Sequence, residues 1–210
     1  MLEPLITLWG YPLSRLEALA FGFALACVWL EVLEIHWAWP LAILSSLLYG
    51  WLFQAYLLYG EAGLQLFFVL ISIWGWWQWL HGRRAGNDAD KSGLHIAPLA
   101  TRFWLPVIAA WLLAWGGLGL ALQQLTDTDV PFFDAFVTAG SIVGTLLMAR
   151  KLIAAWPVLL VANLVATALF GVKQLYLTSL LYAVFALLSI IGWRRWQDQW
   201  HLQSTQAARP

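Results

Sequence analysis

Trp156 and Asn163 are the residues of this chain whose types and spacing best suit recognition of a small molecule. They stand seven positions apart in an apolar stretch, and an α-helix brings residues at that spacing onto one face. An indole stacks on flat rings and attracts a cationic ring by about 0.5–2 kcal/mol per contact. A carboxamide both donates and accepts hydrogen bonds. The pair predicts a site for a flat, hydrogen-bonding solute.

Further uncharged polar side chains occur inside apolar stretches. Glutamine is costly to bury without hydrogen-bond partners, so Gln54 and Gln65 are candidate ligands. Trp74 is a second candidate for stacking. Small hydroxyl side chains more often bond one membrane helix to another, and that alternative stays open for Ser46, Ser72 and Thr138. Tyr182 is the remaining candidate.

The middle parts of the apolar stretches lack groups that could catalyse a reaction. The sequence has no HExxH, no Ser-His-Asp set and no nucleotide-binding glycine loop, and Cys27 is its single cysteine. Its four histidines fall in expected loops or in the tail. We therefore expect no catalytic residue, no metal site and no cofactor. A proton relay needs titratable groups inside the bilayer, so the sequence favours a passive carrier over an ion-coupled pump.

Composition identifies the solvent that surrounds this chain. It is 62% hydrophobic and 10% charged, with sixteen tryptophans in 210 residues and zero net charge. A soluble domain of this length cannot bury so much apolar surface, which indicates a lipid bilayer. The neutral balance gives no indication of a nucleic-acid partner.

An internal repeat organises the chain. Residues 155–196 align without a gap onto residues 38–79, 117 positions earlier, with sixteen of forty-two positions identical. The matches include Trp39 with Trp156 and Gly75 with Gly192, whereas Asn163 falls on Ser46. Repeats in membrane chains are typical of transporters whose substrate lies between the copies.

Seven apolar stretches are long enough to cross a bilayer as helices. They predict an all-α membrane protein in which two parallel three-helix repeats are joined by a connecting helix, a 3+1+3 arrangement like that of SWEET transporters. The expected spans are 15–33, 37–58, 62–80, 103–124, 132–149, 154–172 and 175–196. The segments are an N-terminal interfacial segment (1–14), the first repeat (15–80), a cytosolic linker (81–102), the connecting helix (103–125), the second repeat (132–196) and a cytosolic tail (197–210).

Basic residues set the expected orientation. With the N-terminus outside, nine of the eleven Lys and Arg residues fall on the inner side, and only Arg15 and Lys173 fall outside. This asymmetry predicts a periplasmic N-terminus and a cytoplasmic C-terminus. The first fourteen residues predict a short interfacial helix. Glu17 and Asp134, at equivalent positions of the copies, are interpreted as carboxylates at helix N-termini.

Most tryptophans lie near the expected inner ends of the spans, where an aromatic belt is the default interpretation. They are Trp37, Trp39, Trp76, Trp77, Trp79, Trp104, Trp193, Trp196 and Trp200.

Two segments are similar to a known family. The run WLFQAYLLYGEAGLQLFFVLISIWGWWQW resembles the F-Q-x-x-x-Y-G…Q…I-Y-G-W-Y-x-W hallmark of the nicotinamide riboside transporters of the Pnu family (PnuC type). The segment from Asp134 to Asn163 is similar to that family's D-x-x-x-T-x-x-S…L-M-x-R-K-x-x-x-x-W-x-x-W-x-x-x-N. The run LYLTSLLYAVFALLSIIGWRRW looks like its closing helix.

The resemblance implies a seven-helix 3-1-3 fold, a homotrimer in the bacterial inner membrane, and one substrate path per protomer. It also implies facilitated diffusion of the vitamin precursor, which a cytosolic kinase then traps. Residues at motif positions near the family's substrate site are Trp156, Asn163, Gln54, Gln65, Trp76 and Trp79.

Three departures from the family pattern affect the expected substrate. Leu159 stands in place of the second tryptophan of W-x-x-W, Ser72 in place of an asparagine and Trp74 in place of a tyrosine. Relatives of these carriers handle thiamine, riboflavin or nucleosides. We expect a nicotinamide riboside transporter, with thiamine or another vitamin as the alternative solute. A non-transporting membrane scaffold subunit is the alternative from another class.

Overall fold

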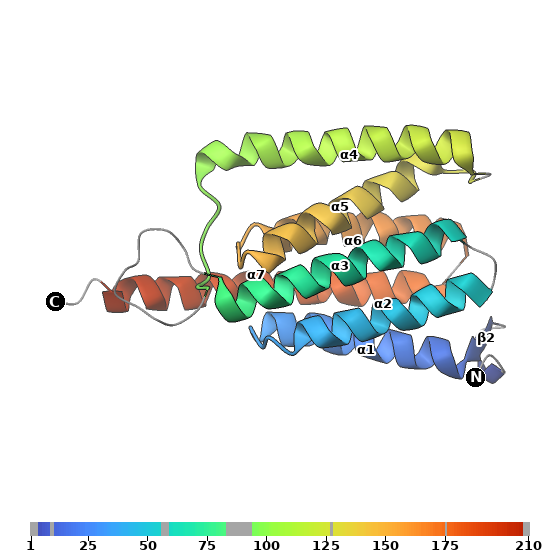
Figure 1. Ribbon diagram of the computed structural model, residues 1–210, viewed down its shortest axis with the longest axis horizontal. Helices are drawn as coiled ribbons and strands as arrows, with labels where there is room; N and C mark the ends of the chain where they lie inside the picture. Colours follow the sequence, from blue (N-terminus) through green and yellow to red (C-terminus); the bar gives the residue numbers. More distant parts are fainter. Residues whose placement is uncertain are drawn as a thin grey trace. The chain divides into compact units, whose positions relative to one another are not determined.

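Seven α-helices make up most of the computed structural model, which describes residues 4–8, 11–55, 59–82, 94–126, 128–174 and 176–207 (Figure 1). The chain forms two compact units, Met1–Gly82 and Arg83–Pro210, which we call unit 1 and unit 2. Unit 1 holds α1 (Arg15–Val32), α2 (Ala38–Ala55) and α3 (Tyr59–His81). Unit 2 holds a 3₁₀ turn (Thr101–Phe103), α4 (Trp104–Leu125), α5 (Pro131–Ala149), α6 (Ala155–Val172) and α7 (Tyr176–Ala207).

The helices coincide closely with the expected spans. Pro131 occupies the first turn of α5, where its missing N–H costs nothing. The exception is α7, which continues to Ala207 although its span was expected to end at 196. The polar segment after Trp196, which was expected to be a cytosolic tail, is helical through Ala207.

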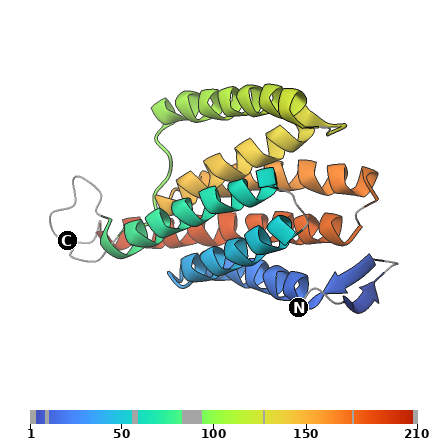
Figure 2. The ribbon, with the colours of Figure 1, turned by 45° about the vertical axis from the view of Figure 1, so that its right-hand side comes forward.

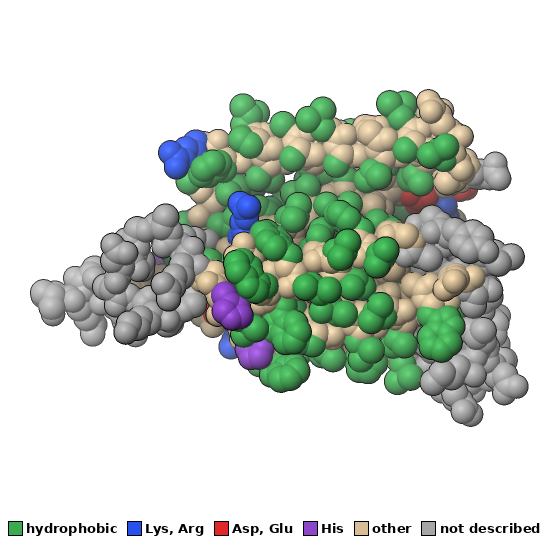
Figure 3. Space-filling model, in the orientation of Figure 1, with side chains coloured by type: hydrophobic (Ala, Val, Ile, Leu, Met, Phe, Trp, Pro, Cys, Tyr) green, Lys and Arg blue, Asp and Glu red, His purple; other side chains and the backbone are tan. Residues whose placement is uncertain are grey.

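Length and apolar composition qualify four helical segments to cross a bilayer on their own: Gly63–His81, Thr101–Leu125, Pro131–Ala149 and Ala155–Val172. Phe21–Val32 and Ala38–Leu52 are shorter apolar helices. Hydrophobic side chains cover much of the face shown in Figure 3, and the charged side chains seen there lie near the helix ends. Such surfaces are stable in lipid rather than in water.

Packing follows the same order in both units. In unit 1, α2 packs against both α1 and α3, and in unit 2, α6 packs against both α5 and α7. The second helix of each expected repeat therefore lies between the first and the third. Helix α4 packs against α5 (Figure 1).

The N-terminal segment differs from expectation. The strands β1 (Pro4–Leu8) and β2 (Tyr11–Ser14) form an antiparallel hairpin ahead of α1 (Figure 2), so the predicted short interfacial helix is wrong. Pro4 and Pro12 disfavour a helix interior in this segment. The side chains of Trp9 and Tyr11, two aromatic residues of this segment, lie outside the described part of the chain.

The turn between α1 and α2 has the same form as the turn between α5 and α6. Glu34 has φ 62° and Lys151, 117 positions later, has φ 48°. Around Glu34, the N–H of Ile35 donates to the carbonyl of Leu30 at 2.9 Å. Around Lys151, the N–H of Leu152 donates to the carbonyl of Leu147 at 3.0 Å. A single left-handed residue closing such a 6→1 bond ends a helix in the manner of a Schellman motif.

A short extended segment crosses this turn in unit 2. The N–H of Ala97 donates to the carbonyl of Lys151 at 3.1 Å, and the N–H of Ile153 donates to the carbonyl of Ala97 at 3.0 Å. Leu94 and Ile96 beside it are buried, at 9% and 2% exposure. We call residues 94–100 the strap. It connects the segment before α4 to the turn between α5 and α6.

Candidate functional site

Trp156, the leading candidate for stacking, is completely buried inside unit 2. Its benzene edge lies against Gly192 of α7, so closely that a Cβ on that glycine would lie 2.5 Å from the ring. It meets the ring of Trp196 edge to face, with centroids 5.4 Å apart at 90°. Edge-to-face pairs of this kind add about 0.5–1.5 kcal/mol to the burial itself. The ring is packed between α6 and α7.

Unit 1 contains the same arrangement at the equivalent positions. Trp39 is 1% exposed, and a Cβ on Gly75 would lie 2.4 Å from its ring. Its centroid is 5.6 Å from that of Trp79, at 82°. We call Trp39, Gly75 and Trp79 the first knot and Trp156, Gly192 and Trp196 the second. For Trp39, Trp79 and Trp196 the belt interpretation is wrong, because these rings are buried among helices.

Other tryptophans agree with the belt interpretation. Trp37, Trp77 and Trp104 are 59%, 56% and 37% exposed. In an apolar chain such rings face lipid or the membrane interface.

Asn163 lies on the same face of α6 as Trp156, which confirms the face predicted from their spacing, because both contact α7. The Asn163 amide donates to Ser189 Oγ at 3.3 Å, and this hydroxyl donates to the carbonyl of Phe185 at 2.8 Å. Both side chains are buried, at 8% and 2% exposure. The helix-to-helix role expected of small hydroxyl groups is thus observed for Ser189, which was not among the predicted site residues.

The same helix pair carries more polar contacts. Thr167 Oγ1 donates to the carbonyl of Asn163 at 2.8 Å, and Ser179 Oγ donates to the carbonyl of Thr167 at 2.8 Å. Tyr182 stacks on Phe170, with centroids 5.2 Å apart at 14°. Thr138, on α5, is half-buried. Hydroxyl and aromatic side chains therefore follow the α6–α7 contact along most of its length.

The candidates in unit 1 are distributed over α2 and α3. Ser72 is buried, at 3% exposure, whereas Ser46, Gln65, Trp74 and Trp76 are half-buried and Gln54 is exposed. Gln65 lies next to Gly50 of α2, where an added Cβ would be 3.5 Å from that of the glutamine. Ser45, also omitted, is buried at 6% exposure. Only Gln54, among these, points out of its unit.

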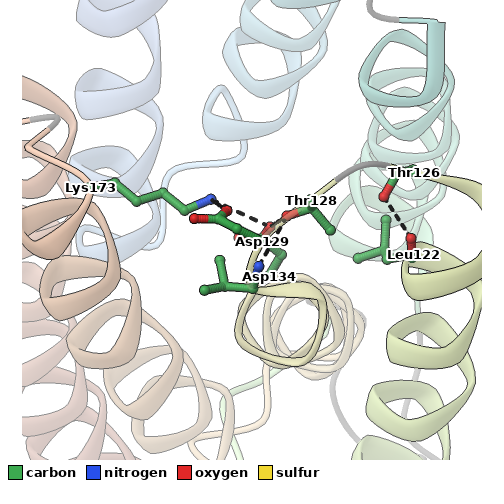
Figure 4. Close-up of polar contacts among 7 residues, drawn as sticks. Leu122, Thr126, Thr128, Asp129, Asp134 and Lys173 are labelled. Carbon is green, nitrogen blue, oxygen red and sulfur yellow. Dashed lines mark hydrogen bonds and ion pairs between the residues drawn. The ribbon is translucent and has the colours of Figure 1, made fainter.

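Charged residues meet at the other end of unit 2, where α5 begins and α6 ends (Figure 4). Lys173 Nζ lies 3.1 Å from Asp129 and 3.9 Å from Asp134. Thr128 donates to Asp134 at 2.8 Å. Asp134 lies in the first turn of α5, as the helix N-terminal interpretation predicted, whereas the Glu17 side chain lies outside the described residues. The hydrogen bond from Lys173, aided by its charge, lowers the pKa of Asp129.

The signal for the omitted residues was present in the repeat. Trp39, Gly75 and Ser189 all belong to the sixteen matched positions, but a match does not reveal which ring contacts which glycine.

Within the described residues, no group of three or more His, Cys, Asp or Glu side chains is arranged to hold a metal ion.

Comparisons with known proteins place this geometry in context. The nicotinamide riboside transporter PnuC of Escherichia coli (strain K12) is 26% identical over 209 residues, covering 89% of this chain and 87% of that protein. The riboflavin/roseoflavin transporter RibM of Streptomyces davaonensis is 28% identical over 154 residues, covering 73% and 69%. These relatives are transporters and not enzymes, as expected from the missing catalytic groups.

The fold has a counterpart among solved structures. The crystal structure of the vitamin B3 transporter PnuC superposes with a TM-score of 0.71 at 23% identity, covering 88% of this chain and 81% of that one. A model of the nicotinamide mononucleotide transporter family matches residues 14–198, nearly the whole described chain. This chain is therefore a member of the nicotinamide mononucleotide transporter family.

Proposed function

We propose that this chain carries nicotinamide riboside across the bacterial inner membrane by facilitated diffusion. The observation that carries the proposal is the alignment of the E. coli nicotinamide riboside transporter with 89% of the chain. Flow is then directed by a cytosolic kinase, which phosphorylates the arriving solute and keeps it inside. The proposal agrees with the absence of titratable side chains from the middle of the apolar stretches.

The solute contacts Trp156 and Asn163 in unit 2, with Thr138 and Tyr182 as further contacts. The candidate contacts within unit 1 are Gln54, Gln65, Trp74 and Trp76, with Ser46, Ser72 and Trp79 as the remaining candidates. An amide and an indole on one face of α6 suit a flat cationic ring that carries a carboxamide. Because Trp156 is fully buried against α7, we infer that α6 and α7 separate when solute binds. The structure described above is then a closed state.

Binding measurements on purified protein test this site. Replacing Trp156 or Asn163 by Ala should weaken nicotinamide riboside binding by ~1–3 kcal/mol in calorimetry. Leu164→Ala is the matched control, since Leu164 follows Asn163 and is 54% exposed. Unchanged affinity in both variants, with normal thermal unfolding, would remove these two residues from the site.

Another vitamin is the second candidate solute. The likeness to a riboflavin/roseoflavin transporter favours a wider range of solutes. Thiamine belongs in the same comparison, because it also contains a flat cationic ring. Uptake of labelled nicotinamide riboside, riboflavin and thiamine into liposomes ranks the three. If none of the three enters the liposomes faster than it enters empty vesicles, the scaffold subunit is favoured instead.

The proposal includes an assembly and a topology. Two parallel three-helix repeats are joined by α4, all seven helices cross the bilayer, the N-terminus is periplasmic and the chain forms a homotrimer. The nine-to-two distribution of basic residues and the shared turn of the two units support this arrangement. Native mass spectrometry in detergent measures the oligomer, and labelling of a cysteine placed at Ser204 from either side measures the orientation.

A further inference from the structure

Three ring nitrogens at one end of unit 1 are buried and have no hydrogen-bond partner among the described residues. They are His36 Nδ1, Trp39 Nε1 and Trp76 Nε1. Leaving a buried polar group without a partner carries a free-energy penalty, so each such group in a native structure needs an explanation. They belong to the α1–α2 turn, the first turn of α2 and the last turns of α3, and a ligand that binds at this end of the unit would satisfy them.

The three residues belong to one piece of the fold. His36 lies in the turn between α1 and α2, and its carbonyl accepts a hydrogen bond from the N–H of Trp39 at 3.3 Å. The Trp39 ring in turn lies against Gly75 of α3. Trp76 is the next residue of that helix. We call His36, Trp39 and Trp76 the ring-nitrogen cluster.

Unit 2 repeats part of this arrangement. Trp156 corresponds to Trp39, it is packed in the same kind of knot, and its Nε1 is also buried without a partner in the described part of the chain. The position of His36, however, is taken by Ile153. The feature common to both copies is therefore one indole N–H donor, held rigidly by a glycine and a second indole.

The chemistry of a ligand at this end of unit 1 follows from these atoms. An indole N–H can only donate, so the ligand must present acceptor oxygens. Either a solute or an ordered water has such oxygens. An ordered water needs about two to four polar partners, which the three ring nitrogens of unit 1 also offer, so the variants below are chosen to distinguish water from a solute. A solute bearing hydroxyl or carboxamide oxygens brings its other hydrogen bonds with it.

We propose that the ring-nitrogen cluster is a solute-binding site of unit 1, at which Trp39 and Trp76 donate to uncharged oxygen atoms of the transported molecule. His36 completes the site as a third hydrogen-bonding group. The proposal rests on the proposed function, because it takes the solute to be the transported vitamin. It adds His36 and Trp39 to the residues that bind it.

The test compares neighbouring tryptophans of opposite exposure. Trp39→Phe and Trp76→Phe remove an indole N–H while keeping an aromatic ring. Trp37→Phe and Trp77→Phe make the same change one residue from a cluster member, at rings that are 59% and 56% exposed. Calorimetry with nicotinamide riboside, riboflavin and thiamine first identifies the probe that the unaltered protein binds. Thermal unfolding of each variant shows whether the variant is still folded.

Affinity for that probe should fall about three- to tenfold in Trp39→Phe and in Trp76→Phe, as expected for one lost hydrogen bond each. The two control variants should stay within about twofold of the unaltered protein. His36→Phe should weaken binding in the same direction.

Other outcomes separate the two proposals. A lower melting temperature with unchanged affinity in the cluster variants would mean bound water only, and would overturn the solute site alone. Equal losses in the cluster and control variants would also overturn it. If the unaltered protein binds none of the three probes, the proposed function fails, and the solute site fails with it.

Discussion

One glycine decides where a large ring can lie in each unit of this protein. Gly192 leaves room for the benzene edge of Trp156, and Gly75 leaves the same room for Trp39. Any larger residue would push the indole toward a second ring, Trp196 or Trp79. Interiors are packed too densely to absorb such a shift without strain. These glycines therefore act through packing and not through backbone freedom.

Gly192→Ala is expected to destabilise the protein by about 1–3 kcal/mol, because the new methyl group overlaps the Trp156 ring. Gly75→Ala should act in the same direction at the first knot. Thermal unfolding in detergent measures both changes. Gly116→Ala on α4 is the matched control, since its Cβ would meet nothing within 4 Å, and it should be neutral or slightly stabilising. Equal stability of Gly192→Ala and Gly116→Ala would show that the Trp156 ring is not held by this contact.

The Lys173–Asp129 pair gives a pH dependence at the residue scale. The pKa of Asp129 is lowered by Lys173, so the pair is present at neutral pH. A carboxyl whose pKa is lower in the folded state stabilises above its unfolded pKa, near about 3.9, and loses this contribution as pH falls through the folded value. The difference in melting temperature between the unaltered protein and Lys173→Met should therefore shrink below about pH 4. A constant difference down to about pH 2 would contradict the pairing.

At the scale of elements, the strap joins the connecting segment to the turn between α5 and α6. Two backbone hydrogen bonds through Ala97 and the buried side chains of Leu94 and Ile96 hold it there. The strap therefore holds the segment that precedes α4 against the turn between α5 and α6. Sequence alone could not reveal this, because the bonds are formed by backbone groups some fifty residues apart.

Ala97→Pro is expected to destabilise unit 2 by about 1–3 kcal/mol, because proline cannot donate to the carbonyl of Lys151. Ala100→Pro is the matched control in the same segment. Ala100 has φ −61°, which proline adopts without strain, so this change should be close to neutral. Thermal unfolding compares the two variants. A control as unstable as Ala97→Pro would mean that the segment tolerates no proline, whatever its hydrogen bonds.

Element types could be predicted where one physical signal dominates. Long apolar stretches bounded by turn residues specify helices in a bilayer, since every backbone group is satisfied within the helix. The N-terminal hairpin lacks that signal, because cross-strand pairing depends on a partner segment. The end of α7 was also missed, since the polar residues after Trp196 continue a helix as readily as they form a tail.

The whole molecule is expected to equilibrate its solute and not to concentrate it. The ionisable residues of the apolar stretches are confined to their ends, which leaves no relay for coupling to protons. In liposomes without a kinase, labelled nicotinamide riboside should reach the external concentration and stop. An imposed proton gradient should leave that plateau unchanged. Accumulation above the external concentration would contradict passive transport.

Sequence alone determined the solvent, the seven helices and the duplication, because composition, stretch length and internal identity are properties of the chain in one dimension. It also placed Trp156 and Asn163 on one face of α6, since helical periodicity requires it. The tertiary structure decided that this face packs on α7, that Trp156 lies against Gly192, and that Asn163 donates to Ser189. These contacts join residues from 26 to 36 positions apart, and which side chain fills which gap depends on how whole helices pack.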